Sequence, residues 1–452
     1  MKIPQLFDDK QFYKSLFTIA VPIMFQNLIN SLVNMLDTVM IGRLGTIEIA
    51  AVGLGNNFFF LYNMFLFGIC SGGAIFTAQF WGSRDIAGIR KNTGFCLILS
   101  VSMGMLFTVA AVLVPERILG IYSKDPEVVK TGTAYLRTLA PAFIPYSISF
   151  VFILTLRSVE RVRLAMITTL IALSLNLTLN YVFIFGFGPI PAMGVAGAAT
   201  ATVISRITEM LIMISVSYVR RYPPAGTIPE FLGFNADFVR RFIRIAFPVI
   251  VNEIIWSLGV SAQNIIFART HTDAIAAFNI TNTVSQLTWV FFIGLGNGVA
   301  TLIGKKIGER NDRAARDYAS RIIRFAPLIA FAAAPVLLLL SRLLPYIFKV
   351  TPAVLTHAGI MFIILTCSYP FRAFNMSMVI GICRAGGDTV FCMIYDLVFM
   401  WTAALPLAGI ASFFFNAPVW VIYLCLCSEE PLKAILGFQR YKSGKWLRHV
   451  TE

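Results

Sequence analysis

Long apolar runs alternate with short polar segments along almost the whole chain. Each run approaches or exceeds the ~20 residues that an α-helix needs to cross a bilayer. The pattern predicts twelve membrane-spanning helices, six in each half, over residues 14–40, 46–76, 93–114, 131–156, 164–186, 194–218, 242–266, 273–303, 320–343, 355–381, 389–412 and 417–438. The sequence therefore predicts an all-α integral membrane protein.

The segment from Ser15 to Asp85 recurs in a second copy that begins near Ile243. Without a gap, Pro22 falls on Pro248, which sets the repeat offset, since 248 − 22 = 226. The same offset pairs Arg43 with Arg269, Ala50 with Ala276, Asn56 with Asn282, Gly68 with Gly294, Gly72 with Gly298 and Gly82 with Gly308. A long internal repeat in an apolar chain is typical of transporters built from two equivalent lobes.

The repeat also defines the expected domains. Arg157 and Arg384 match in two basic turns at an offset that is larger by one, since 384 − 157 = 227. We expect an amino-terminal lobe over 1–218, a cytoplasmic linker rich in Pro and Gly over 219–241, and a carboxyl-terminal lobe over 242–452. Because each lobe has an even number of spans, the two lobes have parallel topology and are related by an axis along the membrane normal.

Composition and charge support a membrane location. The chain is 58% hydrophobic and 13% charged, with a mean hydropathy of +0.78, whereas soluble domains contain about 25% charged residues. Most of the basic residues behind the net charge of +15 lie in loops on one side, which the positive-inside rule assigns to the cytoplasm. These clusters are Arg84–Lys91, Arg157–Arg163, Arg220–Arg244, Lys305–Arg324 and Lys433–Arg448.

Charge and motif content lead to further expectations about location and partners. Both termini are cytoplasmic, and the protein is a multi-pass protein of the cell inner (plasma) membrane. The basic loops contact anionic lipids. Since no basic groove is interleaved with aromatic residues, we expect no nucleic-acid partner. No cofactor motif occurs, and we expect the protein to be a monomer.

Two prolines mark equivalent places in the first and seventh spans. Pro22 and Pro248 each remove a backbone hydrogen bond, so we expect a bend at both and a hinge in the moving protein. Prolines are also common in membrane helices that do not move. The glycine pairs of the second and eighth spans are expected to let helix backbones pack closely.

Asp37 lies deep in the apolar first span. A carboxylate there costs ~2.5–3.5 kcal/mol, so it should face the protein interior. Asn176 and Asn180 are four residues apart on one helix face, and Thr202 lies on the small-residue face of the sixth span. These oxygens suit either Na⁺ or a protonated acid. We predict a cation-coupling site from these four residues, with Na⁺ possible at Asp37, Asn176 and Asn180.

The second half differs in its charges. Gln263 aligns with Asp37, and Glu253 aligns with Asn27. Glu253 could form a second cation or substrate site, or pair with basic residues of the linker side; Asp396 is a further candidate. With Gln263 and Asn282, these residues form a possible second site. Two local ion pairs are also expected, Arg206 with Glu209 and Lys433 with Glu429 or Glu430.

Polar and aromatic residues recur in the second and eighth spans. They suggest a cavity that binds amphipathic organic cations through cation–π contacts, although aromatic residues also face lipid in many membrane proteins. The residues concerned are Asn56, Asn57, Asn63, Asn279, Asn282, Gln286, Phe58, Phe59, Phe60, Trp289, Phe291 and Phe292.

The chain resembles the multidrug and toxic compound extrusion (MATE) family over nearly its whole length. The resemblance is carried by AVPIMFQNLINSLVNMLDTVMIGRLG in the first span, the two copies of the second span, the turns at Arg157 and Arg384, and the final FQRYKSGKWLR. It implies two six-helix lobes that export substrates by antiport against H⁺ or Na⁺. It also implies a bend at Pro22 and a cation site at Asp37, Asn176 and Asn180.

The chain departs from two branches of that family. In one branch an aspartate replaces the second asparagine, which here is Asn180. In another branch, acids lie in spans seven and ten, where this chain has Trp256 and no acid over 355–381. The sequence is therefore assigned to neither branch.

Two other functions compete with that of an exporter. A flippase for lipid-linked oligosaccharides or other lipid precursors would need a strongly cationic cleft, but only Arg206 and Arg372 are expected inside the membrane. A polytopic membrane enzyme would need a cluster of catalytic side chains at the bilayer surface. The sequence contains no HExxH, no GxSxG and no carboxylate pair at a useful spacing.

Overall fold

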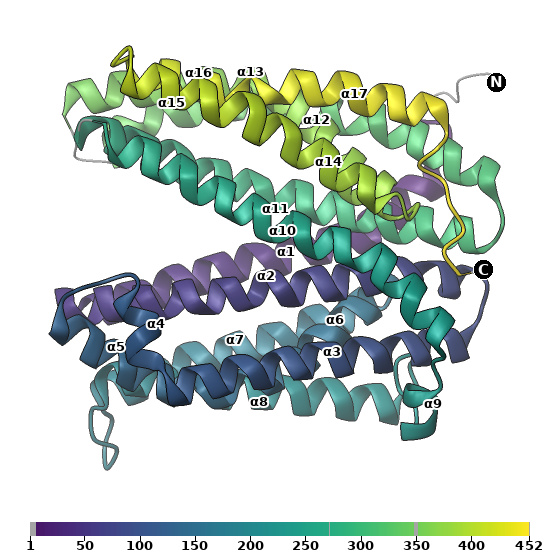
Figure 1. Cartoon of the computed structure of the whole chain (residues 1–452), viewed down its shortest axis with the longest axis horizontal. Helices are drawn as coiled ribbons and strands as arrows, with labels where there is room; N and C mark the ends of the chain where they lie inside the picture. Colours follow the sequence, from purple (N-terminus) through teal and green to yellow (C-terminus); the bar gives the residue numbers. More distant parts are fainter. Residues whose placement is uncertain (1–5, 271, 348–350, 452) are drawn as a thin grey trace. The chain divides into compact units, whose positions relative to one another are not determined.

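The computed structural model describes residues 6–270, 272–347 and 351–451, and these are helical almost throughout (Figure 1). The first half of the chain forms α1 (Lys10–Gly42), α2 (Thr46–Gly82), α3 (Ile86–Leu113), α4 (Pro115–Gly120), α5 (Pro126–Leu139), the 3₁₀ turn η1 (Ala140–Ala142), α6 (Phe143–Ser158), α7 (Val162–Phe185), α8 (Gly194–Val219) and α9 (Ile228–Leu232).

The second half repeats this order with more interruptions. It forms α10 (Ala236–Ala268), α11 (Thr272–Gly308), α12 (Asp312–Ile347), α13 (Pro352–Met376), the π-helix η2 (Ser377–Arg384), α14 (Thr389–Phe399), the π-helix η3 (Met400–Ala404), α15 (Leu405–Phe413), α16 (Val419–Cys427) and α17 (Glu429–Ser443).

Eleven helical stretches in the described residues are long and apolar enough to cross a membrane. Three of them combine consecutive segments: α5 with η1 and α6, α13 with η2, and α14 with η3 and α15. The twelfth predicted span, 417–438, corresponds to α16 and α17, which follow one another around Ser428. The predicted fold class, an all-helical membrane protein with about twelve spans, is confirmed.

The chain packs into two compact units whose boundaries lie beside the two prolines. One unit, the amino-terminal unit, contains Phe25–Ile250; the carboxyl-terminal unit contains the residues up to Met24 and those from Val251 onward. The boundaries are separated by the repeat offset, since 250 − 24 = 226. Each boundary follows its proline by two residues. Helices α1 and α10 therefore begin in one unit and end in the other, whereas the predicted lobes divide at the linker.

The glycines of α2 hold the first part of α10 within the amino-terminal unit. A Cβ atom on Gly72 would lie 2.5 Å from Cβ of Ala246, and one on Gly68 would lie 2.7 Å from Cα of Ile250. Real Cβ atoms do not approach other heavy atoms so closely. The two helix backbones can therefore pack at this distance only because these positions are glycine, as the sequence predicted.

The carboxyl-terminal unit repeats this contact between α11 and the first part of α1. A Cβ atom on Gly294 would lie 3.1 Å from the backbone nitrogen of Met24, and one on Gly298 would lie 3.2 Å from Cβ of Ala20. These four residues are the repeat equivalents of the previous four. In each unit a pair of glycines thus packs against a helix just before it crosses into the other unit.

The turns between helices also repeat. Arg84 after α2 and Arg310 after α11 adopt positive φ values of 59° and 55°. Glu160 after α6 has φ of 62°, and Gly387 in the corresponding turn has φ of 74°. The left-handed conformation favours glycine, and the second half uses it at that place.

The linker is folded against the amino-terminal unit. α9 packs on α3 so closely that a Cβ atom on Gly94 would clash with the carbonyl oxygen of Phe231. Thr227 and Glu230 form a capping box at the start of α9. The Glu230 carboxylate also pairs with Arg90 of α3. The segment between the two lobes is therefore attached to the first of them.

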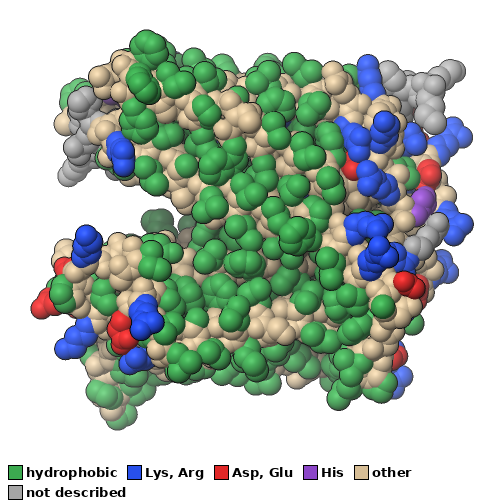
Figure 2. Space-filling view, viewed as in Figure 1, with side chains coloured by type: hydrophobic (Ala, Val, Ile, Leu, Met, Phe, Trp, Pro, Cys, Tyr) green, Lys and Arg blue, Asp and Glu red, His purple; other side chains and the backbone are tan. Residues whose placement is uncertain are grey.

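The surface of each unit matches a lipid environment. In the face seen in Figure 2, hydrophobic side chains cover most of the length of the helices, while Lys and Arg side chains gather near the helix ends. Large apolar side chains such as Leu106, Phe247 and Phe331 are at least 60% exposed in the absence of lipid. The protein is a multi-pass membrane protein.

Candidate cation-coupling site

Asp37 lies on α1 within the amino-terminal unit and faces α7. Asn180 donates a hydrogen bond of 2.7 Å from Nδ2 to Asp37 Oδ1. The same Nδ2 lies 3.3 Å from Asn176 Oδ1. The two amides are one turn apart on α7, which places both beside α1. The structure therefore gives the carboxylate a neutral amide partner.

Thr202 completes this group from α8. Asn176 Nδ2 lies 3.4 Å from Thr202 Oγ1, and that hydroxyl donates to the carbonyl of Ala198 at 3.0 Å. The structure thus brings together all four residues that the sequence proposed for the site, from three helices. We refer to Asp37, Asn176, Asn180 and Thr202 as the Asp37 cluster.

One oxygen in the Asp37 cluster is left without a partner. Asn180 is only 2% exposed, and its Oδ1 atom has no hydrogen-bond partner among the described residues. A buried acceptor without a donor costs about 1–3 kcal/mol. A protonated carboxyl group would offer a hydrogen-bond donor to this oxygen, and a bound Na⁺ would take the oxygen as a ligand.

A second polar network lies in the same unit. Gln26 donates to Thr169 Oγ1 at 2.7 Å and accepts from Arg157 at 2.6 Å. Thr169 donates in turn to Glu209 at 2.9 Å. Glu209 also pairs with Arg206 at 2.9 Å, which is the local ion pair expected from the sequence.

In the carboxyl-terminal unit, Glu253 has a fixed basic partner. Arg384, at the end of η2, donates to Glu253 Oε1 at 2.6 Å, and both side chains are largely buried. Gln263 on α10 and Asn282 on α11 are half-buried. Neither hydrogen-bonds to Glu253 or Asp396 in the described part of the chain. The structure does not join the four residues of the possible second site into one group.

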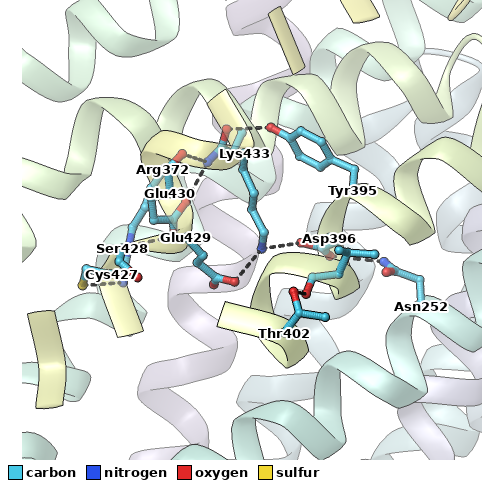
Figure 3. A network of polar contacts seen from close by, with 12 residues as sticks. Asn252, Arg372, Tyr395, Asp396, Thr402, Cys427, Ser428, Glu429, Glu430 and Lys433 are labelled. Atoms are coloured by element: carbon cyan, nitrogen blue, oxygen red, sulfur yellow. Dashed lines mark hydrogen bonds and ion pairs between the residues drawn. The ribbon is translucent and has the colours of Figure 1, made fainter. Parts of the chain in front are cut away.

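Asp396 on α14 also meets a basic side chain (Figure 3). Lys433 Nζ lies 3.2 Å from Asp396 Oδ1 and 3.2 Å from Glu429 Oε2. Asn252 of α10 donates to the other carboxylate oxygen of Asp396 at 3.3 Å. Lys433 is only 4% exposed. Its ammonium lies between two buried or half-buried carboxylates, and the contact with Glu429 is the local ion pair expected from the spacing.

The neighbouring acid pairs with another helix. Arg372 of α13 lies 3.1 Å from Glu430 and takes the place of Lys433, the partner that the sequence spacing suggested. Asn375 donates to the same carboxylate at 2.7 Å and accepts from the Tyr395 hydroxyl at 2.6 Å. The side chains of Figure 3 therefore come from α10, α13, α14, η3, α16 and α17, and link these segments through polar contacts.

Several of these partners were not predicted from the sequence. Gln26, Thr169, Asn252 and Asn375 are neutral polar residues in apolar spans. The signal that could have identified Gln26 and Asn252 is their equivalence in the repeat, since 252 − 26 = 226. Both lie four residues after a proline of the repeat.

Comparison with known proteins identifies the family. The family model MatE matches residues 22–182 and 248–410, one segment in each half of the repeat. The chain belongs to the MATE family. It is therefore a membrane transporter and not an enzyme.

Individual MATE proteins agree with this assignment. The chain is 25% identical to the probable multidrug resistance protein NorM of Thermotoga maritima, with 97% of this chain and 94% of the relative covered. A MATE transporter of the MOP superfamily solved in the outward-facing conformation has a TM-score of 0.87 at 20% identity, covering 98% and 99% of the two chains. A MATE structure in complex with MaL6 has a TM-score of 0.86 at 20% identity, covering 96% and 97%. These structures share the fold of this chain.

Proposed function

We propose that this protein exports amphipathic organic cations by antiport against H⁺ or Na⁺, with the coupling ion bound at the Asp37 cluster. The observation that carries the proposal is the environment of the carboxylate. Asp37 contacts a neutral amide, and that amide keeps a buried oxygen without a donor among the described residues. A small cation would neutralise the charge and satisfy that oxygen.

The roles of related proteins support the substrate class. NorM of Thermotoga maritima is described as a probable multidrug resistance protein. We infer the same broad role here, with drugs or metabolites as substrates. We also propose that the protein acts as a monomer in the plasma membrane. Both termini are proposed to be cytoplasmic, because the positive-inside rule assigns to the cytoplasm the side on which most basic loop residues lie.

Alternating access is the proposed mechanism. Pro22 and Pro248 each lie two residues before the point where a helix passes from one unit to the other. A proline lacks the backbone N–H, so one hydrogen bond of the helix is already missing there and need not be broken when the bend changes. Binding of a cation at Asp37, further along α1, changes the charge that this helix carries. In the proposal, that change alters the helix at Pro22 and triggers release of substrate to the outside.

A lipid-precursor flippase fits the observed charges less well. Recognition of a pyrophosphate would require basic side chains that are free to bind it. Arg206, Arg372, Arg384 and Lys433 instead pair with carboxylates at 2.6–3.2 Å. Their charges are already compensated within the protein.

The test is transport of ethidium, a fluorescent organic cation, in proteoliposomes with H⁺ and Na⁺ gradients imposed separately. Wild-type protein is expected to move the dye under at least one gradient. Asp37→Asn should insert and elute as a folded protein but lose gradient-driven transport, while Asp37→Glu, which keeps a carboxylate, should retain part of it. Transport by Asp37→Asn at the wild-type rate would refute the assignment.

A further inference from the structure

The carboxylates within the helices fall into two groups by the charge of their partners. Asp37 hydrogen-bonds to an uncharged amide. Five other buried or half-buried carboxylates in the described part of the chain face basic side chains: Glu209 faces Arg206, Glu253 faces Arg384, Glu430 faces Arg372, and both Asp396 and Glu429 face Lys433. The hydrogen bond that Asp37 receives therefore comes from a neutral group, whereas each of the others contacts a positive charge.

Lys433 holds its position between carboxylates of two helices. Its ammonium lies 3.2 Å from Asp396 on α14 and 3.2 Å from Glu429 on its own helix, and its side chain is 6% exposed (Figure 3). Burying an isolated ammonium or carboxylate is costly, so each stabilises the other at this place. An ammonium is also a monovalent cation, and it donates hydrogen bonds to oxygen atoms. It therefore occupies the position between the two acids where a free ion would otherwise bind.

Two carboxylates, Asp396 and Glu429, contact the single ammonium of Lys433, so one negative charge remains to be stabilised by other contacts. Asp396 receives a second hydrogen bond from Asn252, and its side chain is 22% exposed, so part of it can be solvated. The charged groups that act on Lys433 are Asp396 on α14 and Glu429 and Glu430 on α17. Glu253 on α10, Arg384 on η2 and Tyr395 on α14 neighbour Asp396, and Arg372 on α13 pairs with Glu430. Two of these acids have their own arginine partners.

The repeat shows that the two halves use equivalent positions differently. Asp396 is the equivalent of Thr169, since 396 − 169 = 227. Thr169 contacts the carboxylate of Glu209 on α8, whereas Asp396 contacts the ammonium of Lys433 on α17. The second half adds a carboxylate at that place and contains a glutamine where the first half has Asp37.

We propose that Lys433 is a built-in counter-cation that keeps the carboxyl-terminal unit out of ion exchange. One monovalent cation is then exchanged in each transport cycle, at Asp37 alone. The second part of this statement rests on the proposed function, whereas the role of Lys433 follows from its own contacts and can be tested separately.

The experiment counts the ions that the purified full chain binds in detergent. Na⁺ is counted by equilibrium binding of radioactive sodium, and protons by potentiometric titration between about pH 5 and about pH 8. The proteins are wild type, Asp37→Asn, Asp37→Asn with Lys433→Gln, and Asp37→Asn with Lys433→Arg. The arginine variant keeps the positive charge and controls for changes in packing.

We expect wild-type protein to bind one ion more than Asp37→Asn. Adding Lys433→Gln to Asp37→Asn should restore binding of about one ion, because Asp396 and Glu429 lose their internal cation. Adding Lys433→Arg should restore none. If Asp37→Asn binds as many ions as wild type, the proposed site at Asp37 is rejected. An additional ion bound after Lys433→Gln is introduced would still support the role of Lys433 in that case.

Glu429→Gln in the wild-type background provides a test that leaves Lys433 in place. It should leave the number of bound ions unchanged, because Glu429 exchanges none in the proposal. Loss of a bound ion in Glu429→Gln would overturn the inference. It would also be overturned if Asp37→Asn still bound an ion and the further substitution Asp396→Asn removed that ion. Either result would show that the carboxyl-terminal unit takes part in ion exchange.

Discussion

Arg384 donates a hydrogen bond of 2.6 Å to Glu253, and Arg157 donates one of the same length to Gln26. The two contacts span the same sequence separation, since 384 − 253 = 131 and 157 − 26 = 131. In each unit, an arginine after the fourth span of its half therefore binds the helix that passes from one unit to the other. It binds this helix within three residues of the boundary, at Gln26 of α1 and at Glu253 of α10. The contact is an ion pair in the carboxyl-terminal unit and a bond to a neutral amide in the other.

This difference predicts unequal costs for removing the two arginines. Arg384→Met leaves the Glu253 carboxylate largely buried without its cation, and breaking a buried pair in this way typically costs about 3–5 kcal/mol. Arg157→Met leaves only the neutral Gln26 without a donor, which costs about 1–3 kcal/mol. Apparent melting temperatures in detergent, measured by tryptophan fluorescence, should therefore fall further for Arg384→Met.

The double variant Arg384→Met with Glu253→Gln provides the control. It removes both charges, so it should recover part of the stability lost in Arg384→Met. No recovery would mean that the loss comes from other contacts of Arg384, and that the pair with Glu253 is not the main contribution.

The glycine contacts predict a graded response to an added methyl group. Gly72→Ala would place Cβ 2.5 Å from Cβ of Ala246, whereas Gly298→Ala would place it 3.2 Å from Cβ of Ala20. Overpacking of this kind costs about 1–3 kcal/mol. We expect Gly72→Ala to lower the apparent melting temperature clearly and Gly298→Ala to change it little.

Gly53 on the same helix as Gly72 is the matched control. It is exposed, and a Cβ atom there would meet no other heavy atom within 4 Å. Gly53→Ala should therefore be neutral or stabilising by up to ~1 kcal/mol, because alanine favours the helix. Equal melting temperatures for Gly53→Ala and Gly72→Ala would contradict the close packing of α2 on α10.

Sequence patterns could predict the helices and the repeat because these depend on local composition and on alignment of the chain with itself. They could also predict which residues share a helix face, as with Asn176 and Asn180. The Asp37 cluster was reached in this way. Its residues are few, and each is polar in an otherwise apolar span.

The contacts between different helices could not be predicted in the same way. The spacing on one helix could predict the contact of Lys433 with Glu429, but not its second contact, with Asp396 on another helix. Its partner Asp396 is 37 residues away in the chain, and Arg372 on α13 lies 58 residues before its partner Glu430 on α17, since 430 − 372 = 58. Which helix faces which depends on packing, and periodicity gives only the face that each helix presents.

The geometry of the Asp37 cluster predicts how Asn180 affects the choice of ion. Na⁺ needs several oxygen ligands, and the Oδ1 of Asn180, which has no partner among the described residues, is available as one. A proton on Asp37 needs no such ligand. Asn180→Leu is therefore expected to weaken the apparent affinity for Na⁺ at least about tenfold, or about 1.4 kcal/mol, and to leave proton-driven transport measurable.

Initial rates of ethidium transport, measured against increasing Na⁺ at constant pH and against a pH gradient without Na⁺, check this expectation. Thr202→Val is the control, because the contact of Thr202 within the cluster is with Asn176, at 3.4 Å. Thr202→Val should lower the apparent affinity for Na⁺ less than Asn180→Leu does. An unchanged Na⁺ dependence in Asn180→Leu would argue against Asn180 as a ligand.

The linker offers a prediction about pH that lies outside the membrane. The backbone N–H of Thr227, followed by the Arg90 guanidinium, lowers the pKa of Glu230 below its usual range. A carboxylate with a lowered pKa stabilises the fold above the pKa of the unfolded chain, about 4.3, and this contribution is lost as the pH falls through the lowered value. The capping box and its attachment to α3 should therefore loosen in acid.

Hydrogen exchange over residues 227–232 measures this loosening directly. Exchange, corrected for its intrinsic dependence on pH, should increase as the pH falls below about 4. Glu230→Gln cannot ionise, so it should exchange faster at neutral pH and show little further change in acid. Asp237→Asn, at the start of α10, is a control that leaves the box intact. Protection that stays constant in wild-type protein down to the lowest pH tested would show that the box does not depend on the charge of Glu230.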